Sequence, residues 1–505
     1  MMNARHDFKL EPGGAADAAI ARGGWVVLKF GGTSVSSRPR WETIAETIGE
    51  RLGEGCRVLV VCSALSQVSN RIEALLARAA RREDPGSGQA ALWQNHARLA
   101  AALGVDADER LADLRAELSD LLEGVRLTQE LTPRLTARVM AIGELASTRL
   151  GVQWLRSRGL RACWQDAREL LVAQVQPRAQ ACPERQYLSA TCDCAFDPEV
   201  EGELRGRARV IVTQGFIARL PSGDGVLLGR GGSDTAAAYL AGKLAARRIE
   251  IWTDVPGMFT ANPRQVPEAR LLRRLGYGEA GELASKGAKV LHPRSIAAAR
   301  ERGIPIHVRC TPRPELPGTV ISAEETAAPP QVKAVAARKG MILVSMDVAG
   351  DWQQVGLLAE VTGRFADHGL SIDLLASSQT NLVAALDPAA NPVDDGSLSA
   401  LLGELEAISS PRLIRPAASV SLVGTGIREI LHEWAPVLRC FEDVDIHLVA
   451  QAANDLSLSL VVGEERADRL VADLHRQLFS DVRAAGPFGP TWESLCGEPA
   501  AVLTA

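Results

Sequence analysis

Two glycine-rich segments of the sequence combine a permissive backbone with charged and hydroxyl side chains. Residues 29–35 read Lys-Phe-Gly-Gly-Thr-Ser-Val directly after an apolar run, and residues 229–235 read Gly-Arg-Gly-Gly-Ser-Asp-Thr directly before a helical stretch. Paired glycines let backbone N–H groups approach a ligand closely, and the start of a helix adds a partial positive charge. Both segments are therefore candidates for binding an anionic group.

The charged side chains give the two segments different ligand preferences. Lys29 adds a fixed cation to the first segment, which suits a phosphate. Arg230 and Asp234 add a guanidinium and a carboxylate to the second, which suits a zwitterion with a carboxylate at one end and an ammonium at the other. Either segment alone could be a structural turn, but the pair indicates a kinase that acts on an amino acid.

Other phosphate-binding motifs are missing from the sequence. Gly242-Lys243 is followed by Leu244, so there is no Walker A loop. The His-Arg-Asp and Asp-Phe-Gly motifs of protein kinases are also absent. A Gly-x-Gly-x-x-Gly match starts at Gly276, but residues 269–275 before it have a helical pattern rather than a strand pattern, so we interpret this match as chance.

Composition narrows the class of protein. A hydrophobic share of 46% over 505 residues is ample for packed cores, and the net charge of −5 argues against nucleic acid as a partner. No apolar run approaches the roughly 20 residues that cross a membrane. The nine scattered cysteines predict a reduced, cytoplasmic protein. Cys182, Cys192 and Cys194 lie close together, but they lack a fourth ligand and the usual spacing of a metal site.

A catalytic domain is predicted at residues 25–322, after a flexible extension at 1–24 that lacks the apolar core of a signal peptide. Within this domain, apolar β-branched runs alternate with amphipathic stretches, which predicts an α/β fold with a mostly parallel sheet between helices. Ligands of such folds bind at the carboxyl ends of the strands, where both glycine-rich segments fall. The polar, proline-containing residues 174–203 are predicted to form a flap over this site.

The pattern changes after a proline-containing linker predicted at residues 323–340. Residues 341–416 read as strand, helix, two strands, helix and strand, and the same order returns at 417–482. This repeat predicts two ferredoxin-like units in tandem. Neither unit carries a constellation of catalytic side chains, so we expect the pair to be a sensor. The tail at 483–505 has no place in either unit.

These residues resemble those of aspartate kinases of the amino acid kinase family, over nearly the whole chain. The matching segments are residues 28–35, 60–70, 143–144, 213–217, 228–238, 251–264 and 287–293. The sequence at 251–257 is nearest to the lysine-sensitive type. The resemblance implies an amino acid kinase fold followed by two ACT domains. It also implies an enzyme that uses ATP and Mg²⁺ to convert L-aspartate into 4-phospho-L-aspartate, the feedback-regulated first step of lysine, threonine and methionine biosynthesis.

The resemblance also assigns the catalytic and substrate-binding residues. Lys29 and Asp234 would be catalytic, with Lys29 holding the transferring phosphoryl group. Arg230 would clamp the α-carboxylate of aspartate bidentately, and Glu144 together with Asp234 would pair with its α-ammonium. The remaining substrate-binding residues are Ser63 and Ser69, near the β-carboxylate, and Gly231, Gly232 and Ser233. No general base is needed, because the attacking carboxylate is already ionised at neutral pH.

For the nucleotide, the resemblance implies that Thr253 and Asp254 lie near the base and ribose, and that Arg264 and Lys289 lie near the phosphates. Phe259 stands where a tyrosine is usual, which removes a hydroxyl near adenine. The remaining ATP-binding residues belong to the first glycine-rich segment and are Lys29, Gly31, Gly32 and Thr33. Because the change at 259 removes no charge near phosphate, we expect at most a modest change in nucleotide affinity.

The first ACT unit is expected to bind an inhibitory amino acid, L-lysine. The helix that begins near Leu357 offers free N–H groups to a carboxylate, and Asp373 can accept the ammonium of the ligand. The remaining effector residues are Ser371, Ser378 and Gln379. Lysine-sensitive relatives have phenylalanine at 357 and glutamate at 379, so a weaker affinity for lysine or a contribution from threonine is expected. In the family this site forms between chains that pair through their ACT domains, which implies a homo-oligomer.

Several alternatives stay open at this point. The same fold could act on another small carboxylate or a carbamate, although Glu144, Arg230 and Asp234 favour an α-amino acid. The chain could also be an inactive amino-acid sensor or part of a bifunctional lysine-pathway fusion, and the ACT pair could serve dimerisation alone. An assay of aspartate-dependent ADP release, repeated with lysine and threonine, tests the substrate, the activity and the regulation.

Overall fold

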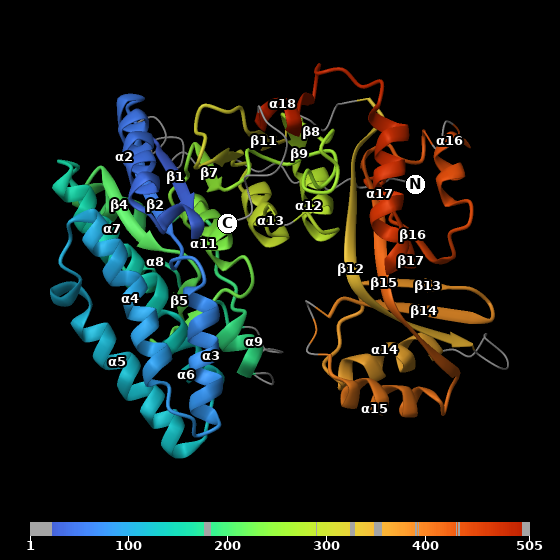
Figure 1. The fold of residues 1–505 in the computed structure, drawn as a ribbon, viewed down its shortest axis with the longest axis horizontal. Coiled ribbons are helices and arrows are strands. Elements are labelled where there is room, and N and C mark those ends of the chain that lie inside the picture. Colours follow the sequence, from blue (N-terminus) through green and yellow to red (C-terminus); the bar gives the residue numbers. More distant parts are fainter. Residues whose placement is uncertain are drawn as a thin grey trace, which may run out of the picture. The chain divides into compact units, whose positions relative to one another are not determined.

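The computed structural model describes residues 23–175, 183–288, 290–323, 329–347, 356–388, 391, 393–430, 432 and 435–496. The chain divides into two compact units (Figure 1). The first unit comprises residues 1–257 and 290–324, and the second comprises 258–289 and 325–505. The sequence predicts one uninterrupted catalytic domain at 25–322, whereas residues 258–289 pack with the second unit. Residues 1–22 of the predicted extension lie outside the described residues.

A mostly parallel sheet forms the core of the first unit. Its strands run in the order β3-β4-β2-β1-β7-β10-β11, and all neighbours are parallel except β10 and β11. The bounds are β1 Trp25–Phe30, β2 Arg57–Cys62, β3 Ala162–Trp164, β4 Val210–Gln214, β7 Arg248–Thr253, β10 Ile306–Cys310 and β11 Thr319–Ser322. Every residue of β1 is buried, as expected for a parallel strand that is covered on both faces.

Helices cover both faces of this sheet. On one face, Val26 and Leu28 of β1 share a buried cluster with α2 (Arg38–Gly53) and α7 (Ile142–Ser157). The alternate residues of β1 point to the other face, where α11 (Gly232–Lys243) packs against β1, β2 and β7. The other elements of the unit are η1 Thr33–Val35, α3 Val68–Ala80, α4 Gly86–Leu103, α5 Ala107–Thr128, α6 Pro133–Met140, α8 Ala167–Leu170, α9 Pro183–Leu188, α10 Pro198–Arg207, α13 Pro293–Glu301 and the hairpin of β5 Ile217–Arg219 and β6 Gly225–Leu227.

The second unit contains an antiparallel sheet in the order β13-β14-β12-β15-β17-β16. Its strands are β12 Gln331–Asp347, β13 Leu374–Ser377, β14 Asn381–Leu386, β15 Ser410–Thr425, β16 Ile446–Gln451 and β17 Ser457–Gly463. The described helices after residue 355 are α14 Leu357–Asp367, α15 Asp395–Leu405, α16 Ala435–Leu438, η4 Arg439–Phe441, α17 Glu464–Phe479 and α18 Trp492–Cys496. The two ACT units share one sheet because β12 and β15 pair along their whole length, from residue 331 to residue 347 of β12.

The long strands correct parts of the sequence prediction. The linker predicted at 323–340 is shorter, because residues 332–336 are buried in the first half of β12. The short strand predicted at 412–415 is part of β15, which also runs across the predicted boundary at 416–417. The helix predicted at 427–438 is reduced, in the described part of that stretch, to the short α16. A sheet shared by both repeats therefore replaces two separate ferredoxin-like sheets.

Residues 258–289 form a small substructure of the second unit, with β8 (Arg270–Leu272), β9 (Arg274–Gly276) and α12 (Tyr277–Ser285). The helical pattern predicted for 269–275 is wrong, and the Gly-x-Gly-x-x-Gly match does lie between a strand and a helix. However, the Glu279 carboxylate accepts the N–H of Gly276 at 2.9 Å and the ammonium of Lys333 at 2.8 Å. The chain's own side chains thus fill this helix N-terminus.

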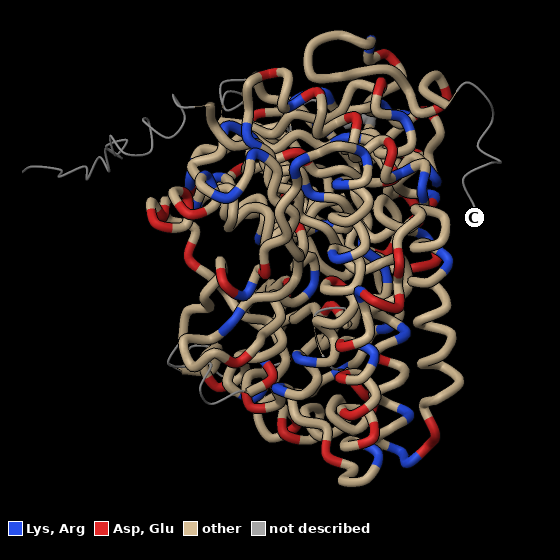
Figure 2. Tube along the Cα trace, turned by 90° about the vertical axis from the view of Figure 1, so that its left-hand side faces the viewer, with Lys and Arg blue, Asp and Glu red and all other residues tan. Residues whose placement is uncertain are grey.

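Acidic and basic residues are interspersed along the described trace (Figure 2). None of the described helices is long and apolar enough to cross a membrane. Among the described residues, no three His, Cys, Asp or Glu side chains gather as metal ligands. Cys192 and Cys194 are buried free thiols, and Cys182 lies outside the described residues. Two helices, α9 and α10, occupy described parts of the predicted flap.

Candidate active site

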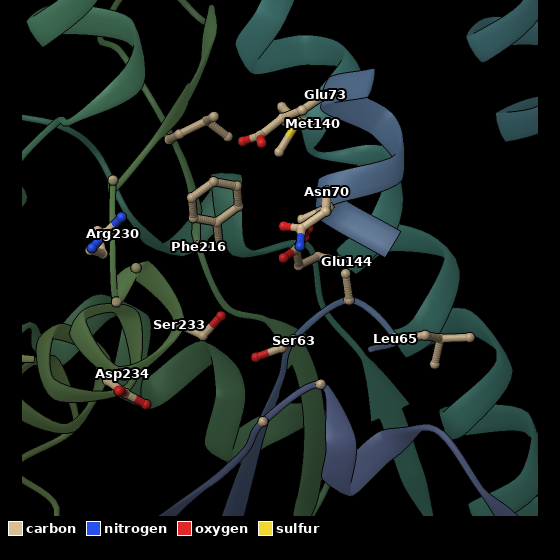
Figure 3. Close-up of a pocket in the computed structure, with 18 of the residues that line it drawn as sticks. Ser63, Leu65, Asn70, Glu73, Met140, Glu144, Phe216, Arg230, Ser233 and Asp234 are labelled. Carbon is tan, nitrogen blue, oxygen red and sulfur yellow. The ribbon is translucent and has the colours of Figure 1, made fainter. Parts of the chain in front are cut away.

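The carboxyl ends of β1 and β2 open into a cavity of about 640 Å³ (Figure 3). Its walls come from the loop after β1, the turn between β2 and α3, helices α6 and α7, and the loop before α11. The lining residues that the sequence predicts are Lys29, Gly31, Gly32, Ser63, Ser69, Glu144, Arg230, Gly231, Gly232, Ser233 and Asp234. The fold therefore brings both glycine-rich segments to one cavity within the first unit.

Two glycines of the cavity have no space for a side chain. A Cβ on Gly32 would lie 2.9 Å from the carbonyl oxygen of Ala64, in the turn after β2. Gly231 has a φ of 65°, and a Cβ there would lie 2.3 Å from the Cβ of His292. The paired glycines thus allow the two loops to approach the turn after β2 and the start of α13.

Lys29 and Asp234 form an ion pair in which Nζ lies 2.6 Å from Oδ1. Lys29 comes from the end of β1 and Asp234 from the first turn of α11, and both side chains are about one-tenth exposed. The two predicted catalytic residues are therefore in direct contact. The pair fixes a cation at the carboxyl edge of the sheet, where an anionic phosphoryl group can reach it.

Glu144 has a different environment, although it lines the same cavity. It is 3% exposed, and its Oε2 atom has no hydrogen-bond partner in the described part of the chain. Burial raises the pKa of this carboxyl to about 8, although the backbone N–H groups of Ala64 and Glu144 favour the charged form. A cation that enters the cavity would restore the ionised carboxylate, which makes Glu144 a suitable partner for an ammonium group.

The charged groups of the cavity are arranged with opposite signs. Figure 3 shows Arg230 on one side and Glu144 on the other, with Phe216 between them and Ser63 and Ser233 below in this view. Arg230 is exposed, whereas Glu144 is buried. A ligand with a carboxylate at one end and an ammonium at the other matches this polarity.

A buried hydrogen-bond network behind the cavity was not evident from the sequence. The Ser147 hydroxyl lies 2.8 Å from the carbonyl oxygen of Ser63, and the Thr148 hydroxyl donates to the carbonyl oxygen of Glu144 at 2.8 Å. Gln214 at the end of β4 donates to the Thr148 hydroxyl at 2.9 Å. The network ties α7 to the ends of β2 and β4, and so fixes the residues that carry Ser63 and Glu144.

Other lining residues were also missed by sequence reasoning. They are Ala64, Leu65, Ser66, Gln67, Asn70, Glu73, Thr136, Met140, Leu188, Phe216 and Leu227. Gln67 has a φ of 64° before α3, a left-handed conformation that is uncommon for a residue other than glycine. Two signals were available: residues 64–68 connect the predicted Ser63 and Ser69, and residues 64–70 and Phe216 lie in segments that match the family.

Comparisons with known proteins agree with this geometry. The model of the amino acid kinase family matches residues 24–310. The lysine-sensitive aspartokinase 3 of Escherichia coli (strain K12) is 32% identical over 467 residues, which cover 90% of this chain and 99% of that protein. The chain belongs to the aspartokinases of the amino acid kinase family. Aspartokinase 3, chloroplastic, of Arabidopsis thaliana is 30% identical, with 90% of this chain and 81% of that protein covered.

Solved structures support the same family assignment. The crystal structure of E. coli aspartokinase III in complex with aspartate and ADP (R-state) has a TM-score of 0.77 and 31% identity, covering 90% of this chain and 99% of that one. The same relative in complex with lysine and aspartate (T-state) has a TM-score of 0.66 at 31% identity and the same coverage. The predicted fold, with C-terminal ACT domains, and the predicted aspartate kinase class are therefore confirmed.

The nucleotide-binding residues predicted for this aspartokinase do not all lie in the same unit of the structure. Thr33 begins η1 and Thr253 ends β7, the strand beside β1, so both lie at the carboxyl edge of the first sheet. The Thr253 hydroxyl donates to the Asp254 carboxylate at 3.1 Å. The others are Phe259 and Arg264, which belong to the second unit, and Lys289, which lies outside the described residues. Their nucleotide roles stay predictions.

The predicted effector residues lie around the start of α14 and of β13. Leu357 is the first residue of α14 and is buried, after a Gly356 with a φ of 102°. Ser371 and Asp373 precede β13, so they lie before this strand rather than on it. Ser378 accepts the N–H of Asn381 at 3.1 Å, and Gln379 is exposed. These locations leave the effector roles as predictions.

Asp373 is already paired. It accepts a hydrogen bond from the guanidinium of Arg338 on β12, which also donates to Asp387 at 3.1 Å. The side chains of Arg338 and Asp373 are 17% and 28% exposed. An ammonium group that binds Asp373 would compete with this guanidinium.

Proposed function

We propose that this aspartokinase transfers the γ-phosphoryl group of ATP to the β-carboxylate of L-aspartate and releases 4-phospho-L-aspartate and ADP. The observation that carries the proposal is the polarity of the cavity. A buried carboxylate with an unpartnered oxygen, Glu144, lies opposite the guanidinium of Arg230. This arrangement matches the two ends of an α-amino acid.

The roles of the residues follow from charge and position. Arg230 clamps the α-carboxylate and Glu144 pairs with the α-ammonium, which orients the substrate. The β-carboxylate is then directed to Ser63, which follows β2, and Ser69, in the first turn of α3, and Lys29 neutralises the charge on the transferring phosphoryl group. Phosphoryl transfer depends mainly on such positioning and charge neutralisation, and the attacking carboxylate needs no general base.

The chemistry of the donor set fits Mg²⁺ bound together with ATP. Mg²⁺ is usually held by one or two carboxylates and by the phosphates of the substrate, rather than by a protein cage. Asp234 is the carboxylate that lies beside Lys29 in the cavity. It would hold the metal when nucleotide binds, in place of the contact with the α-ammonium that the resemblance implies, and Glu144 is then the partner of the α-ammonium. The metal would supply charge neutralisation on the phosphates.

The second unit is proposed to bind L-lysine as a feedback inhibitor and to form a homo-oligomer through its ACT sheet. The E. coli relative is known in complex with lysine and aspartate, which supports lysine as the effector. Leu375 of β13 and Val449 of β16 are exposed apolar side chains on the two edge strands of the sheet. Apolar side chains on unpaired edges are suited to contacts with a second chain.

An ADP-release assay with matched substrates tests the reaction. L-aspartate should support turnover, whereas N-acetyl-L-aspartate, which lacks the ammonium, and succinate, which lacks the α-amino group, should not. Turnover with succinate at the rate seen with aspartate would favour the alternative of another small carboxylate as acceptor. Absence of ADP release with any acceptor, in a protein that binds aspartate, would favour an inactive sensor.

A further inference from the structure

The first turns of α7 pack tightly against the turn that follows β2. A Cβ on Gly143 would lie 2.9 Å from the Cβ of Ala64, so the helix approaches this turn closely enough to leave no space for a side chain. Further along the helix, the buried Ser147 hydroxyl donates to the carbonyl oxygen of Ser63 at 2.8 Å. Between these two contacts lies Glu144, whose carboxyl group interacts with the backbone N–H of Ala64.

The hydroxyl of Ser147 and the carboxyl of Glu144 act on one and the same peptide unit. The carbonyl oxygen of Ser63 and the N–H of Ala64 belong to the planar group that joins these two residues, so the direction of one fixes the direction of the other. Ser147 and Glu144 are three residues apart and share a face of α7. A hydroxyl that holds the carbonyl oxygen therefore also directs the N–H toward the carboxyl group.

The Ala64 N–H has a large influence on Glu144 because few other groups favour its charged form. Burial is the main cause that raises the pKa of Glu144 to about 8, and the backbone N–H groups of Ala64 and Glu144 oppose it. Two of the other charged side chains of the cavity form an ion pair with each other, and the other two are exposed, where solvent weakens their effect. These four described lining residues are Lys29 with Asp234, and Glu73 and Arg230.

We propose that Ser147 is a positioning residue for aspartate, whose hydroxyl holds the Ser63–Ala64 peptide unit so that its N–H supports the Glu144 carboxylate that receives the α-ammonium. The inference rests on the proposed function, in which Glu144 binds that ammonium. Ser147 is fully buried and is not among the residues that line the cavity. Its loss should therefore weaken the binding of aspartate through Glu144 and leave the binding of ATP unchanged.

The test compares the pH dependence of kcat/KM for aspartate in wild type and Ser147→Ala. Without the hydroxyl, the midpoint should move from about pH 8 to about pH 9, the shift expected when a carboxylate loses one hydrogen-bond donor. The value of kcat/KM should then fall about fivefold to tenfold at pH 7 but only about twofold at pH 9, with the KM for ATP unchanged. An equal fall at both pH values, or an equal rise in both KM values, would indicate a loss of packing alone and overturn the proposal.

Three further variants separate the hydroxyl from the helix that carries it. Ser147→Thr keeps the hydroxyl and should keep the midpoint near pH 8, whereas Ser147→Cys has a weaker donor and should lie between wild type and Ser147→Ala. Ser157→Ala removes a hydroxyl of the same helix that donates to the carbonyl oxygen of Trp154 at 2.7 Å, and it should behave as wild type. A similar shift in Ser157→Ala would assign the effect to α7 as a whole and contradict the proposal.

Nuclear magnetic resonance of wild type tests the Ala64 contact even if Ser147→Ala fails to fold. In protein with isotope-labelled alanine, the Ala64 amide proton should move downfield as pH rises through about 8, because a charged acceptor strengthens its hydrogen bond, and it should not titrate in Glu144→Gln. An Ala64 signal that does not titrate in wild type would overturn the proposal. If calorimetry shows that aspartate binds with this pH dependence but no ADP is released from ATP, the proposed reaction fails instead and the positioning role stands.

Discussion

The substrate cavity of the first unit and the effector region of the second each contain an acid–base pair, but they leave different groups for a ligand. In the cavity, Lys29 is paired with Asp234, while Glu144 keeps a buried oxygen that has no hydrogen-bond partner among the described residues. In the effector region, the predicted ligand carboxylate, Asp373, is itself paired with Arg338. With the proposed roles, an amino acid would enter a prepared site in one unit and would have to displace a side chain in the other.

This difference has consequences for affinity. A preorganised site loses little free energy in rearrangement when its ligand binds. A ligand that must replace an internal ion pair gains only the difference between the two interactions. Because Arg338 and Asp373 are partly exposed, solvent weakens their attraction, and the competition should be modest. Weak competition suits a sensor, whose response must follow changes in effector concentration.

The largest effect is expected from Lys29→Ala, which removes the cation at the mouth of the phosphate loop. Loss of one preorganised stabiliser of transition-state charge typically lowers kcat by about 10²–10³-fold. The measurement is ADP release at saturating aspartate, with circular dichroism to check the fold. Lys243→Ala is the matched control, because Lys243 of α11 is equally buried and paired with Asp197 at 3.0 Å outside the cavity. Similar losses in both variants would mean that Lys29 is merely structural.

The sequence predicted the residues that line the cavity better than it predicted which charged side chains of the molecule pair with one another. Lys29, Arg230 and Asp234 were recognised because glycine pairs and charges stand together in short segments. The contacts Lys29–Asp234 and Arg338–Asp373 were not, because each joins elements that are far apart in the sequence and depends on the strand order and register of a sheet. Local patterns reveal candidate groups, but only the tertiary fold decides which of them neutralise one another.

The architecture was predicted only in part, because only its local features leave a signal in the sequence. Alternation of strands and helices is a local signal, and it correctly indicated a mostly parallel sheet. The repeated order of strands and helices after it indicated two ferredoxin-like units, which in the structure share one sheet. The predicted linker includes the first half of β12, because prolines precede this half and because Arg338, Lys339 and Gly340 interrupt the apolar pattern of the strand. Membership of residues 258–289 in the second unit has no local signal, since it arises from packing against β12, β15, α17 and β18 (Phe488–Thr491).

Arg230→Ala should have the next largest effect, on the KM for aspartate. A charge-assisted hydrogen bond contributes roughly 1.5–3 kcal/mol, so the KM for aspartate should rise about tenfold to hundredfold. The KM for ATP should change little, because Arg230 addresses the α-carboxylate. Initial rates with each substrate varied in turn separate the two constants. The reverse result, with ATP affected and aspartate unaffected, would assign the second glycine-rich segment to the nucleotide.

The pH dependence of aspartate binding reports on Glu144. Its pKa is raised to about 8 in the free protein, so the carboxyl is mostly protonated below that pH. The ammonium of aspartate requires the ionised form, and kcat/KM for aspartate should therefore rise with pH up to about 8 and then level off. For the same reason, the free energy of unfolding of the unliganded protein carries the full contribution of protonated Glu144 below its unfolded pKa of 4.5, loses it as pH rises from there to about 8, and is level above 8. Glu144→Gln should lower kcat/KM and remove the slope, and a slope that persists would place the titration elsewhere.

The smallest effect is expected from Arg338→Ala, and its direction tests how the effector region works. Removal of the guanidinium frees Asp373, so half-inhibition by lysine should need about twofold to fivefold less effector, the range for a partly exposed ion pair. Asp373→Ala should abolish inhibition and leave uninhibited activity near that of wild type. Lys339→Ala, which removes a neighbouring cation paired with Asp468, is the control.

If Arg338→Ala instead weakens inhibition, Arg338 contributes to effector binding, for example through the effector carboxylate, and the internal pair holds it ready for that role. If the wild-type enzyme responds to neither lysine nor threonine, neither residue has an effector to bind, and the ACT sheet keeps only its proposed part in assembly.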